Sequence, residues 1–468
     1  MTFSYDLLGR RATLASPNGV ATTYTYDPAG RLIDLAHRTS TGRMLDRFEY
    51  SYNAAGNRLS VTRPEEALSY TYDLLDRFLE ATPTKLRGHD QEQSHKAEIF
   101  TYDPVGNRLS GPGGKDSYFY NPANQLTNDR KHQYRYDRNG NLIQKVEIDD
   151  DGEENWTYSY DAQNRLIKVV KQEEDEILTV TFKYDPFGKR IEKRIEGQEE
   201  GEIESKTYTY VYDNEDIIVE YLTKIEEGKS KTEITRYLHG PGIDEPLAVE
   251  QKGETYSYHA DALGSITALT DRKQKDVQSY EYTSFGELKH KGNKVKQPYT
   301  YTGREWDEEI GLYYYRARYY DADAGRFSQF DPILRGIEER ITRTCSESID
   351  ALPLQRPQEL NSYVYVLNNP INLTDPFGEA PLYGNYCGSG NNPALPIDRL
   401  DVACRDHDNC YDAIGLSGLD AFSTPRDPNV CGAKDSCDDN LCSEAKIFTA
   451  MTFKQRIARF AIMSIFCD

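Results

Sequence analysis

The sequence lacks long hydrophobic runs, an excess of positive charge and, over most of its length, cysteine. Hydrophobic residues make up 37% of the 468 residues, and the most apolar stretch, Phe460 to Phe466, is too short to span a bilayer. The formal net charge of −21 argues against non-specific binding to nucleic acid, which requires positive charge. The first residues lack the charged start and apolar run of a signal peptide, so we expect either a fragment or export without a cleaved signal.

Tyrosine dominates the aromatic residues. The chain has 36 Tyr but 2 Trp and 4 Met. This bias suits β-strands, in which a half-buried ring can cover the core while its hydroxyl reaches water. The tyrosines recur in a motif, Tyr-x-Tyr-Asp-x-x-Gly followed by Arg or Asn, at a spacing of about 20 to 30 residues, which suits one hairpin per repeat. Copies begin at Tyr24, Tyr50, Phe100, Tyr134 and Phe182, and degenerate copies lie at Tyr72, Tyr120, Tyr160 and Tyr212.

Each repeat predicts a β-hairpin. In the copy that begins at Tyr24, the alternating aromatic residues predict one strand, because successive side chains of a strand point to opposite faces. The sequence from Asp27 to Gly30 then predicts a turn, since Asp can bond its own backbone, Pro sets φ and Gly supplies a positive φ. The return strand follows. We therefore expect a mainly β chain whose hairpins pair edge to edge in a long curved sheet.

These motifs resemble the YD repeats of Rhs-type toxins, toxin-complex shells and teneurins. Later segments are similar to the Rhs-associated core of that family, at Tyr301–Glu305, Gly311–Asp321, Gly325–Pro332 and Asn361–Pro370. In that family the repeats spiral into a hollow β-cocoon around a variable C-terminal toxin. The resemblance implies YD repeats over residues 1–300, a core over 301–379 and an enclosed toxin domain over 380–468.

The same resemblance implies that the core cuts the chain. Two aspartates of the family act as an aspartyl protease, in which carboxyl groups that share a proton serve as base and acid. The matching residues are Asp331 and Asp375, and the matching bond joins Glu379 to Ala380. This chain departs from the family pattern at Glu379, where Leu is usual, and in an insertion over residues 335–358. The competing interpretation is that both Asp-Pro pairs only form turns.

Cysteine crowds the end of the chain. Cys345 is the one cysteine before residue 380, and the others are Cys387, Cys404, Cys410, Cys431, Cys437, Cys442 and Cys467. Such density in a small domain predicts disulfides and an oxidising compartment. A zinc site is the alternative, although the Cys-x₂-Cys pairs that it favours are absent.

Two patterns in this region suggest a metal-assisted hydrolase. His407 shares one face of a predicted helix with Cys404 and Tyr411, because these residues follow helical spacing. Gly388 and Gly390 allow a loop whose carbonyl oxygens turn toward one point. Calcium binds carbonyl and carboxylate oxygens, so this loop and an adjacent carboxylate could hold Ca²⁺ while His407 deprotonates a water molecule.

Together, these patterns resemble the secreted phospholipase A2 family. The resemblance implies that His407 is the general base and that the backbone carbonyls of Tyr386, Gly388 and Gly390, with the side chain of Asp408, bind Ca²⁺. Asp438 would orient the histidine, with Asp439 as the competing choice, and Tyr411 would bond that orienting carboxylate.

The phospholipase resemblance also implies disulfides Cys387–Cys404 and Cys410–Cys437, and it leaves the pairing of the other C-terminal cysteines open. This chain departs from animal members of the family, because Asn385 and Ala403 replace cysteines common in them. The implied fold is mainly β, a YD-repeat cocoon followed by a small, disulfide-stapled, α-helical phospholipase A2-like domain.

The resulting functional hypothesis is a secreted bacterial toxin, delivered into target cells, that hydrolyses membrane phospholipid at sn-2 with Ca²⁺. It implies an immunity protein and a secretion-system component as partners, and no nucleic acid. The alternative is a non-catalytic structural or adhesive YD-repeat protein whose C-terminal domain binds calcium. Intact His407 and Asp408 favour the enzyme, because a binding domain needs no base.

Overall fold

The computed structural model describes residues 1–86, 96–111, 114, 117–148, 153–174, 176–199, 202–226, 229–292, 294–335 and 361–379. These residues belong to one compact unit, Met1–Ile337 with Arg356–Ala380. A second unit, Glu338–Gln355 with Pro381–Asp468, lies outside the described residues, as does the predicted helical domain at 380–468.

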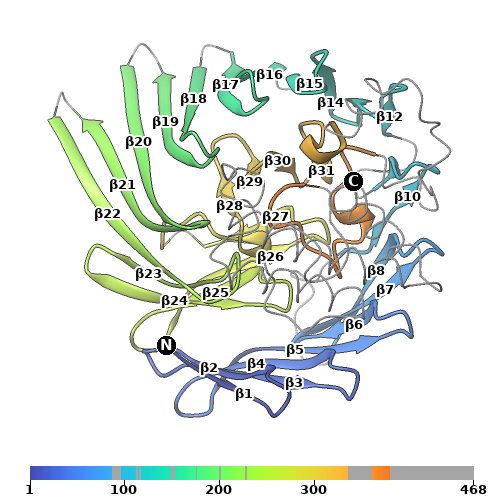
Figure 1. Cartoon of the computed structure of the whole chain (residues 1–468), viewed down its shortest axis with the longest axis vertical. Helices are drawn as coiled ribbons and strands as arrows, with labels where there is room; N and C mark the ends of the chain where they lie inside the picture. Colours follow the sequence, from blue (N-terminus) through green and yellow to red (C-terminus); the bar gives the residue numbers. More distant parts are fainter. Residues whose placement is uncertain are drawn as a thin grey trace, which may run out of the picture. The chain divides into compact units, whose positions relative to one another are not determined.

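The first nine strands form one antiparallel sheet in which each strand pairs with the next along the chain (Figure 1). These strands are β1 (Thr2–Tyr5), β2 (Arg11–Ala15), β3 (Ala21–Tyr26), β4 (Leu32–Arg38), β5 (Met44–Tyr52), β6 (Arg58–Thr62), β7 (Glu66–Tyr72), β8 (Phe78–Lys85) and β9 (Glu98–Ile99). A separate hairpin follows, made of β10 (Thr101–Tyr102) and β11 (Arg108–Ser110).

A 16-stranded sheet continues the same sequential order. It contains β12 (Phe119–Tyr120), β13 (Leu126–Asn128), β14 (His132–Tyr136), β15 (Leu142–Ile148), β16 (Glu153–Tyr160), β17 (Leu166–Glu173), β18 (Glu176–Tyr184), β19 (Arg190–Glu199), β20 (Glu202–Asp213), β21 (Asp216–Glu226), β22 (Lys229–His239), β23 (Pro246–Gln251), β24 (Glu254–Ala260), β25 (Ile266–Thr270), β26 (Asp276–Tyr282) and β27 (Leu288–Lys291). The prediction of successive hairpins that pair edge to edge is confirmed.

The predicted turn chemistry is present in the repeats. In the turn between β3 and β4, the Asp27 carboxylate accepts a hydrogen bond from the Arg31 amide at 2.9 Å, and the Gly30 amide donates to the Asp27 carbonyl at 3.0 Å. Gly30 has a φ of +84°, a conformation that an L side chain disfavours. The hairpin is therefore closed by residues within one motif, which explains why the motif repeats as a local unit.

The second tyrosine of the motif links neighbouring repeats. Its hydroxyl donates to a backbone carbonyl of the preceding repeat, as in Tyr184 to Leu166 at 2.7 Å. The same bond, at 2.6 to 2.9 Å, joins Tyr26 to Arg11, Tyr52 to Leu32, Tyr72 to Arg58, Tyr102 to Phe78, Tyr120 to Arg108, Tyr160 to Leu142, Tyr212 to Arg190 and Tyr282 to Ile266. These hydroxyls, which were expected to reach water, bond backbone carbonyls of the protein, since main-chain acceptors need donors.

The arginine of the motif forms a second link. Arg165 binds the carboxylate of Asp161 at 2.7 Å and donates to the Asp185 carbonyl of the next repeat at 3.3 Å. Its guanidinium also lies 5.0 Å from the centre of the Tyr184 ring. Arg31 and Arg77 repeat the pattern. Hence the Tyr, Asp and Arg of the motif form one contact between consecutive turns.

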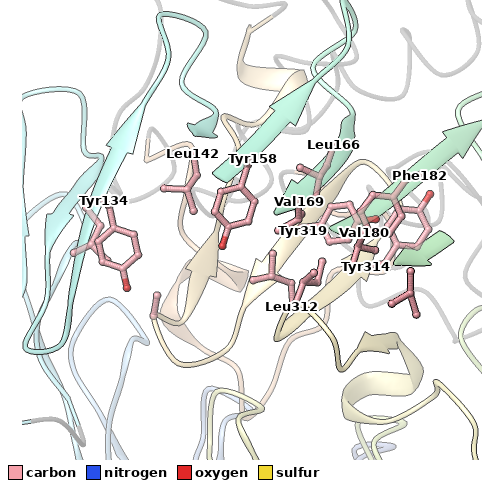
Figure 2. Packing of buried hydrophobic residues seen from close by; sticks show 14 residues of the cluster. Tyr134, Leu142, Tyr158, Leu166, Val169, Val180, Phe182, Leu312, Tyr314 and Tyr319 are labelled. Atoms are coloured by element: carbon pink, nitrogen blue, oxygen red, sulfur yellow. The ribbon is translucent and has the colours of Figure 1, made fainter. Parts of the chain in front are cut away.

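A small four-stranded sheet packs on the face of the long sheet. It consists of β28 (Glu305–Asp307), β29 (Leu312–Tyr315), β30 (Arg318–Asp321) and β31 (Arg326–Phe327), and it follows the 3-10 turn η1 (Tyr301–Gly303). Figure 2 shows Tyr314 and Tyr319 of this sheet beside Phe182 and Val180 of the long sheet. The ring centres of Phe182 and Tyr319 are 5.5 Å apart. This packing gives the small sheet a rigid base.

Buried charges connect the same two sheets. Asp307 of β28 accepts a hydrogen bond from Arg190 of β19 and another from Lys193 of β19, the latter at 2.9 Å. Burial would raise the pKa of Asp307, but the two cations hold it below its usual value. Because each charge has a partner of opposite sign, the network avoids the cost of an unpaired buried ion.

Histidines connect the nine-stranded sheet to β24 of the 16-stranded sheet. His37 of β4 is 2% exposed; its Nε2 atom lies 3.0 Å from the Ala260 carbonyl of β24, and its Nδ1 atom lies 2.8 Å from the Thr22 hydroxyl. The Ala260 carbonyl can only accept, so Nε2 carries the hydrogen. Burial lowers the pKa of His37 to about 4, so the ring is neutral at neutral pH. The His259 ring lies 5.1 Å away, centre to centre. Two neutral imidazoles thus lie at this contact.

The described residues include no helix long and apolar enough to cross a membrane. The last described segment contains the 3-10 turn η4 (Val366–Asn368).

Candidate self-cleavage site

Asp331 and Asp375 reach the small sheet from two separate segments. Asp331 follows β31, and Asp375 lies near the end of the segment 361–379. Asparagines attach this segment to the repeat turns: Asn361 donates to the Asn107 side chain at 2.7 Å, and Asn368 donates to the Gly106 carbonyl at 2.8 Å. The position of Asp375 is therefore set by the repeats.

Both aspartates face one buried arginine. The Nη2 atom of Arg318 lies 2.9 Å from Oδ2 of Asp331 and 3.6 Å from Oδ2 of Asp375. The three residues are 2% to 4% exposed. Arg318 also donates to the Ser362 carbonyl at 2.8 Å, and its guanidinium lies 3.6 Å from the centre of the Phe327 ring. One fixed cation therefore holds both carboxylates in the same small volume.

The two carboxyl groups differ in their surroundings. Burial raises the pKa of Asp375 to about 7, opposed by Arg318 and the Glu379 amide and reinforced by Asp331. Its Oδ2 atom has no hydrogen-bond partner among the described residues. Asp331, by contrast, pairs closely with Arg318 and accepts a 2.8 Å bond from the Ile333 amide. Such asymmetry suits a pair in which one carboxyl keeps a proton that the other lacks.

Both aspartates also form the turn bonds of the competing interpretation. Asp331 accepts from the Ile333 amide, and Asp375 Oδ1 accepts from the Glu379 amide at 3.1 Å. The turn role does not account for the second oxygen of each carboxyl, which faces Arg318. Turn aspartates of the repeats also bind an arginine, but those pairs are more exposed, as in Arg31 at 36% and Asp27 at 13%.

The segment before the predicted cleavage point is held at three consecutive carbonyls. Arg316 donates to the carbonyl of Pro376, the Ala317 amide to Phe377 at 3.1 Å, and Arg318 Nε to Gly378 at 2.5 Å. Arg316 and Ala317 form the turn between β29 and β30, and Arg318 is the first residue of β30. Residues 376–378 therefore lie along these donors, and the bonds fix the backbone just before Glu379.

Two backbone conformations mark this contact as tightly fitted. Gly378 has a φ of +66°, and a Cβ atom there would lie 2.1 Å from the Tyr315 carbonyl oxygen. Arg316 has a φ of +53°, unusual for a residue with a side chain, and its guanidinium pairs with Asp244 at 2.8 Å. Strained backbone of this kind persists where surrounding contacts require it.

Glu379 is the last described residue, and it lies next to the aspartates. Its side chain is partly buried, and its pKa is raised by burial and then by Asp331, against the effect of Arg318. The prediction that Asp331, Asp375 and Glu379 form one site stays a prediction of function, although the three residues lie together. Ala380 lies outside the described residues.

Sequence reasoning missed Arg316 and Arg318. They belong to the run from Tyr313 to Tyr320, which was interpreted as part of the family core without a role for its arginines. Two arginines within an aromatic strand pair were the available signal, because a buried arginine requires carboxylate partners.

The residues of the predicted phospholipase site lie outside the described residues. They are the calcium-binding set Tyr386, Gly388, Gly390 and Asp408, the catalytic pair His407 and Asp438, the supporting Tyr411, and the cysteines Cys387, Cys404, Cys410 and Cys437. No group of three or more His, Cys, Asp or Glu side chains in the described part of the chain is arranged to hold a metal ion. The calcium site stays a prediction.

Comparisons with known proteins agree with the repeat architecture. Residues 82–371 match the teneurin YD-shell family, and residues 5–44 match the RHS repeat. The crystal structure of TcdB2–TccC3 aligns with 81% of this chain and 20% of that chain, with a TM-score of 0.54 and 19% identity. At that identity the likeness concerns the fold alone.

Two curated relatives carry named activities. The tRNA3(Ser)-specific nuclease WapA of Bacillus spizizenii is 30% identical over 390 residues, which are 81% of this chain and 14% of that protein. The double-stranded DNA deaminase toxin A of Burkholderia cenocepacia is 25% identical over 84% of this chain and 22% of its own length. The chain thus spans less than a quarter of either relative.

The prediction of a phospholipase A2 is wrong on these comparisons. The relatives are named for tRNA cleavage or DNA deamination, and neither is named a phospholipase. The prediction depended on a family resemblance confined to a short part of the C-terminal segment, and a short motif match does not define a substrate. The repeat family, in contrast, is established over most of the chain. The chain belongs to the teneurin YD-shell family.

Proposed function

We propose that this chain is the shell of a toxin that cuts itself. The β-repeats act as the carrier of the C-terminal segment, and Asp331 and Asp375 hydrolyse the bond between Glu379 and Ala380. The observation that supports the proposal best is the approach of both carboxylates to the Nη2 atom of Arg318, at 2.9 Å and 3.6 Å. Fixed carbonyls at 376–378 add a held chain segment to this pair.

The chemistry needs one ionised and one protonated carboxyl group. The ionised carboxylate takes a proton from water as the water oxygen bonds to the Glu379 carbonyl carbon. The protonated carboxyl gives its proton to the nitrogen of Ala380 as the carbon–nitrogen bond breaks. The products are a carboxylate at Glu379 and an amine at Ala380. Asp375 suits the protonated role near neutral pH, because burial raises its pKa to about 7.

The names of the relatives support a carrier role for the shell. One is named a tRNA nuclease and another a DNA deaminase toxin, so similar repeats occur in proteins of different chemistry. We infer that this shell carries a toxin segment for delivery into another cell, together with further subunits of a secreted complex. An immunity protein in the producing cell would complete the arrangement.

The experiment is to purify the full chain and determine its covalent state. Self-cleavage predicts two fragments on a denaturing gel, the smaller with Ala380 as its first residue by N-terminal sequencing. Asp331→Asn and Asp375→Asn should each leave one intact chain, because either change removes a carboxyl from the pair.

Asp185→Asn is the matched control. Asp185 precedes proline, and its carboxylate accepts from the Phe187 and Lys189 amides at 2.9 Å, so it forms the same type of turn without facing Arg318. The control protein should be cut like the wild type. Cleavage that persists in Asp375→Asn, or a wild type with a folded shell that stays uncut at every pH between 5 and 8, would refute the proposal and favour a structural YD-repeat protein.

A further inference from the structure

Three carboxyl groups surround a single cation at the proposed cleavage site. Asp331, Asp375 and Glu379 all interact electrostatically with Arg318, which is 2% exposed at its side chain. The other charged group near this segment, Arg316, is already paired with Asp244 and the Pro376 carbonyl. With all three carboxyls ionised, the site would hold two uncompensated negative charges in a buried place, which is costly.

Glu379 cannot leave this cluster by moving its backbone alone. Its amide donates to Asp375 Oδ1 at 3.1 Å, and the carbonyl before it is bound by Arg318 Nε. Asp331 acts electrostatically on its side chain, and Tyr363 is a further titratable group that acts on Arg318. Protonation of Glu379 relieves the charge imbalance without breaking either of these backbone contacts.

We propose that Glu379 sets the acid dependence of self-cleavage: the chain is cut when the Glu379 side chain is neutral and is held uncut when that side chain is ionised. This inference rests on the proposed self-cleavage. An ionised Glu379 adds negative charge beside a carbonyl whose oxygen becomes negative as water attacks, so it opposes the transition state. A neutral Glu379 removes that opposition and leaves Arg318 to balance the aspartates.

The direction of the raised pKa agrees with this geometry. Burial and Asp331 raise the pKa of Glu379, so acidification neutralises it earlier than an exposed glutamate. The dyad has its own limit, since Asp375 loses its proton above about pH 7. The wild type should therefore require a lower pH than a protein that lacks the Glu379 charge. Where one protonation controls the rate, cleavage changes about tenfold per pH unit.

The test uses the full chain made by cell-free translation at pH 8 and shifted to buffers between pH 5 and 8. The cut fraction is followed over time on denaturing gels. Glu379→Gln keeps the size of the side chain but cannot ionise, and Glu379→Leu provides a second neutral variant. Glu250→Gln is the control, because Glu250 is 49% exposed and pairs with Arg236 on the distant strand β22.

The expected result is that Glu379→Gln and Glu379→Leu cut faster than the wild type at pH 7, and that this difference in rate shrinks as the pH falls. Glu250→Gln should follow the wild type. Identical pH profiles for wild type and both Glu379 variants would overturn the inference and leave the self-cleavage proposal intact. No cutting by any of these proteins at any pH would overturn self-cleavage, and this inference with it.

Discussion

Acidification should weaken the contact between the first sheet and strand β24. His37 is neutral in this contact, and at low pH it binds a proton more readily when the contact is open. Burial lowers the pKa of His37 from 6.5 to about 4, partly opposed by Asp46 and assisted by Arg63. Burial also lowers the pKa of His259, and His37 reinforces that shift. A histidine whose pKa is lowered by folding contributes stability that is complete above pH 6.5 and is lost as the pH falls toward 4.

The magnitude follows from the two pKa values of His37. Their difference corresponds to about 3 kcal/mol once the pH lies below both. At pH 5, His37 binds a proton readily when the contact is open and remains neutral when the contact is closed. The equilibrium constant for opening the contact therefore rises about thirtyfold, or about 2 kcal/mol. At pH 7.5 the effect of His37 is negligible, because both forms are neutral.

Hydrogen exchange measured by mass spectrometry can test this value. Peptides from β4 and β24 should lose about thirtyfold in protection between pH 7.5 and 5, after correction for the intrinsic exchange rate. His37→Gln can keep one donor and one acceptor, and it should lose much less protection. A peptide from β18 serves as an internal reference. If β4 of the His37→Gln protein loses as much protection as the wild type, protonation of His37 is not the cause.

Two further predictions concern the links that hold the shell together. Tyr184→Phe removes the donor to the Leu166 carbonyl and should lower the free energy of unfolding by about 1 to 2 kcal/mol. Tyr5→Phe is the control, because Tyr5 is 54% exposed, and it should change the free energy of unfolding little. Urea titration of both proteins measures the difference. Asp307→Asn leaves Arg190 and Lys193 buried without their shared carboxylate and should cost about 3 to 5 kcal/mol by the same assay, so a loss below 1 kcal/mol would contradict the role assigned to this network.

The repeat architecture was predictable because its determinants lie close together in sequence. Asp27 and Gly30 close their hairpin through bonds within five residues, so the motif specifies the turn before any distant contact forms. The hydroxyl of Tyr184 was less predictable, since its acceptor on Leu166 belongs to the preceding repeat. Sequence periodicity gives the strand but not the partner of each polar group.

The candidate site was predictable only in part. Family resemblance indicated Asp331 and Asp375, but the role of Arg318 depends on three segments that meet in space. The charge conflict at Glu379 also becomes visible only with that geometry. The phospholipase prediction failed because a short resemblance in the C-terminal segment was used to infer a substrate. Substrate choice depends on the whole binding surface, which a short motif does not define.

The contacts that hold residues 376–378 do not depend on whether the chain is cut after Glu379. The donors from Arg316, Ala317 and Arg318 all act on carbonyls that precede the proposed cut. None of them needs a covalent connection to residue 380, so hydrolysis alters connectivity while the shell keeps the same contacts. Under the proposal, the breaking of the bond and the separation of the two fragments would therefore be distinct events.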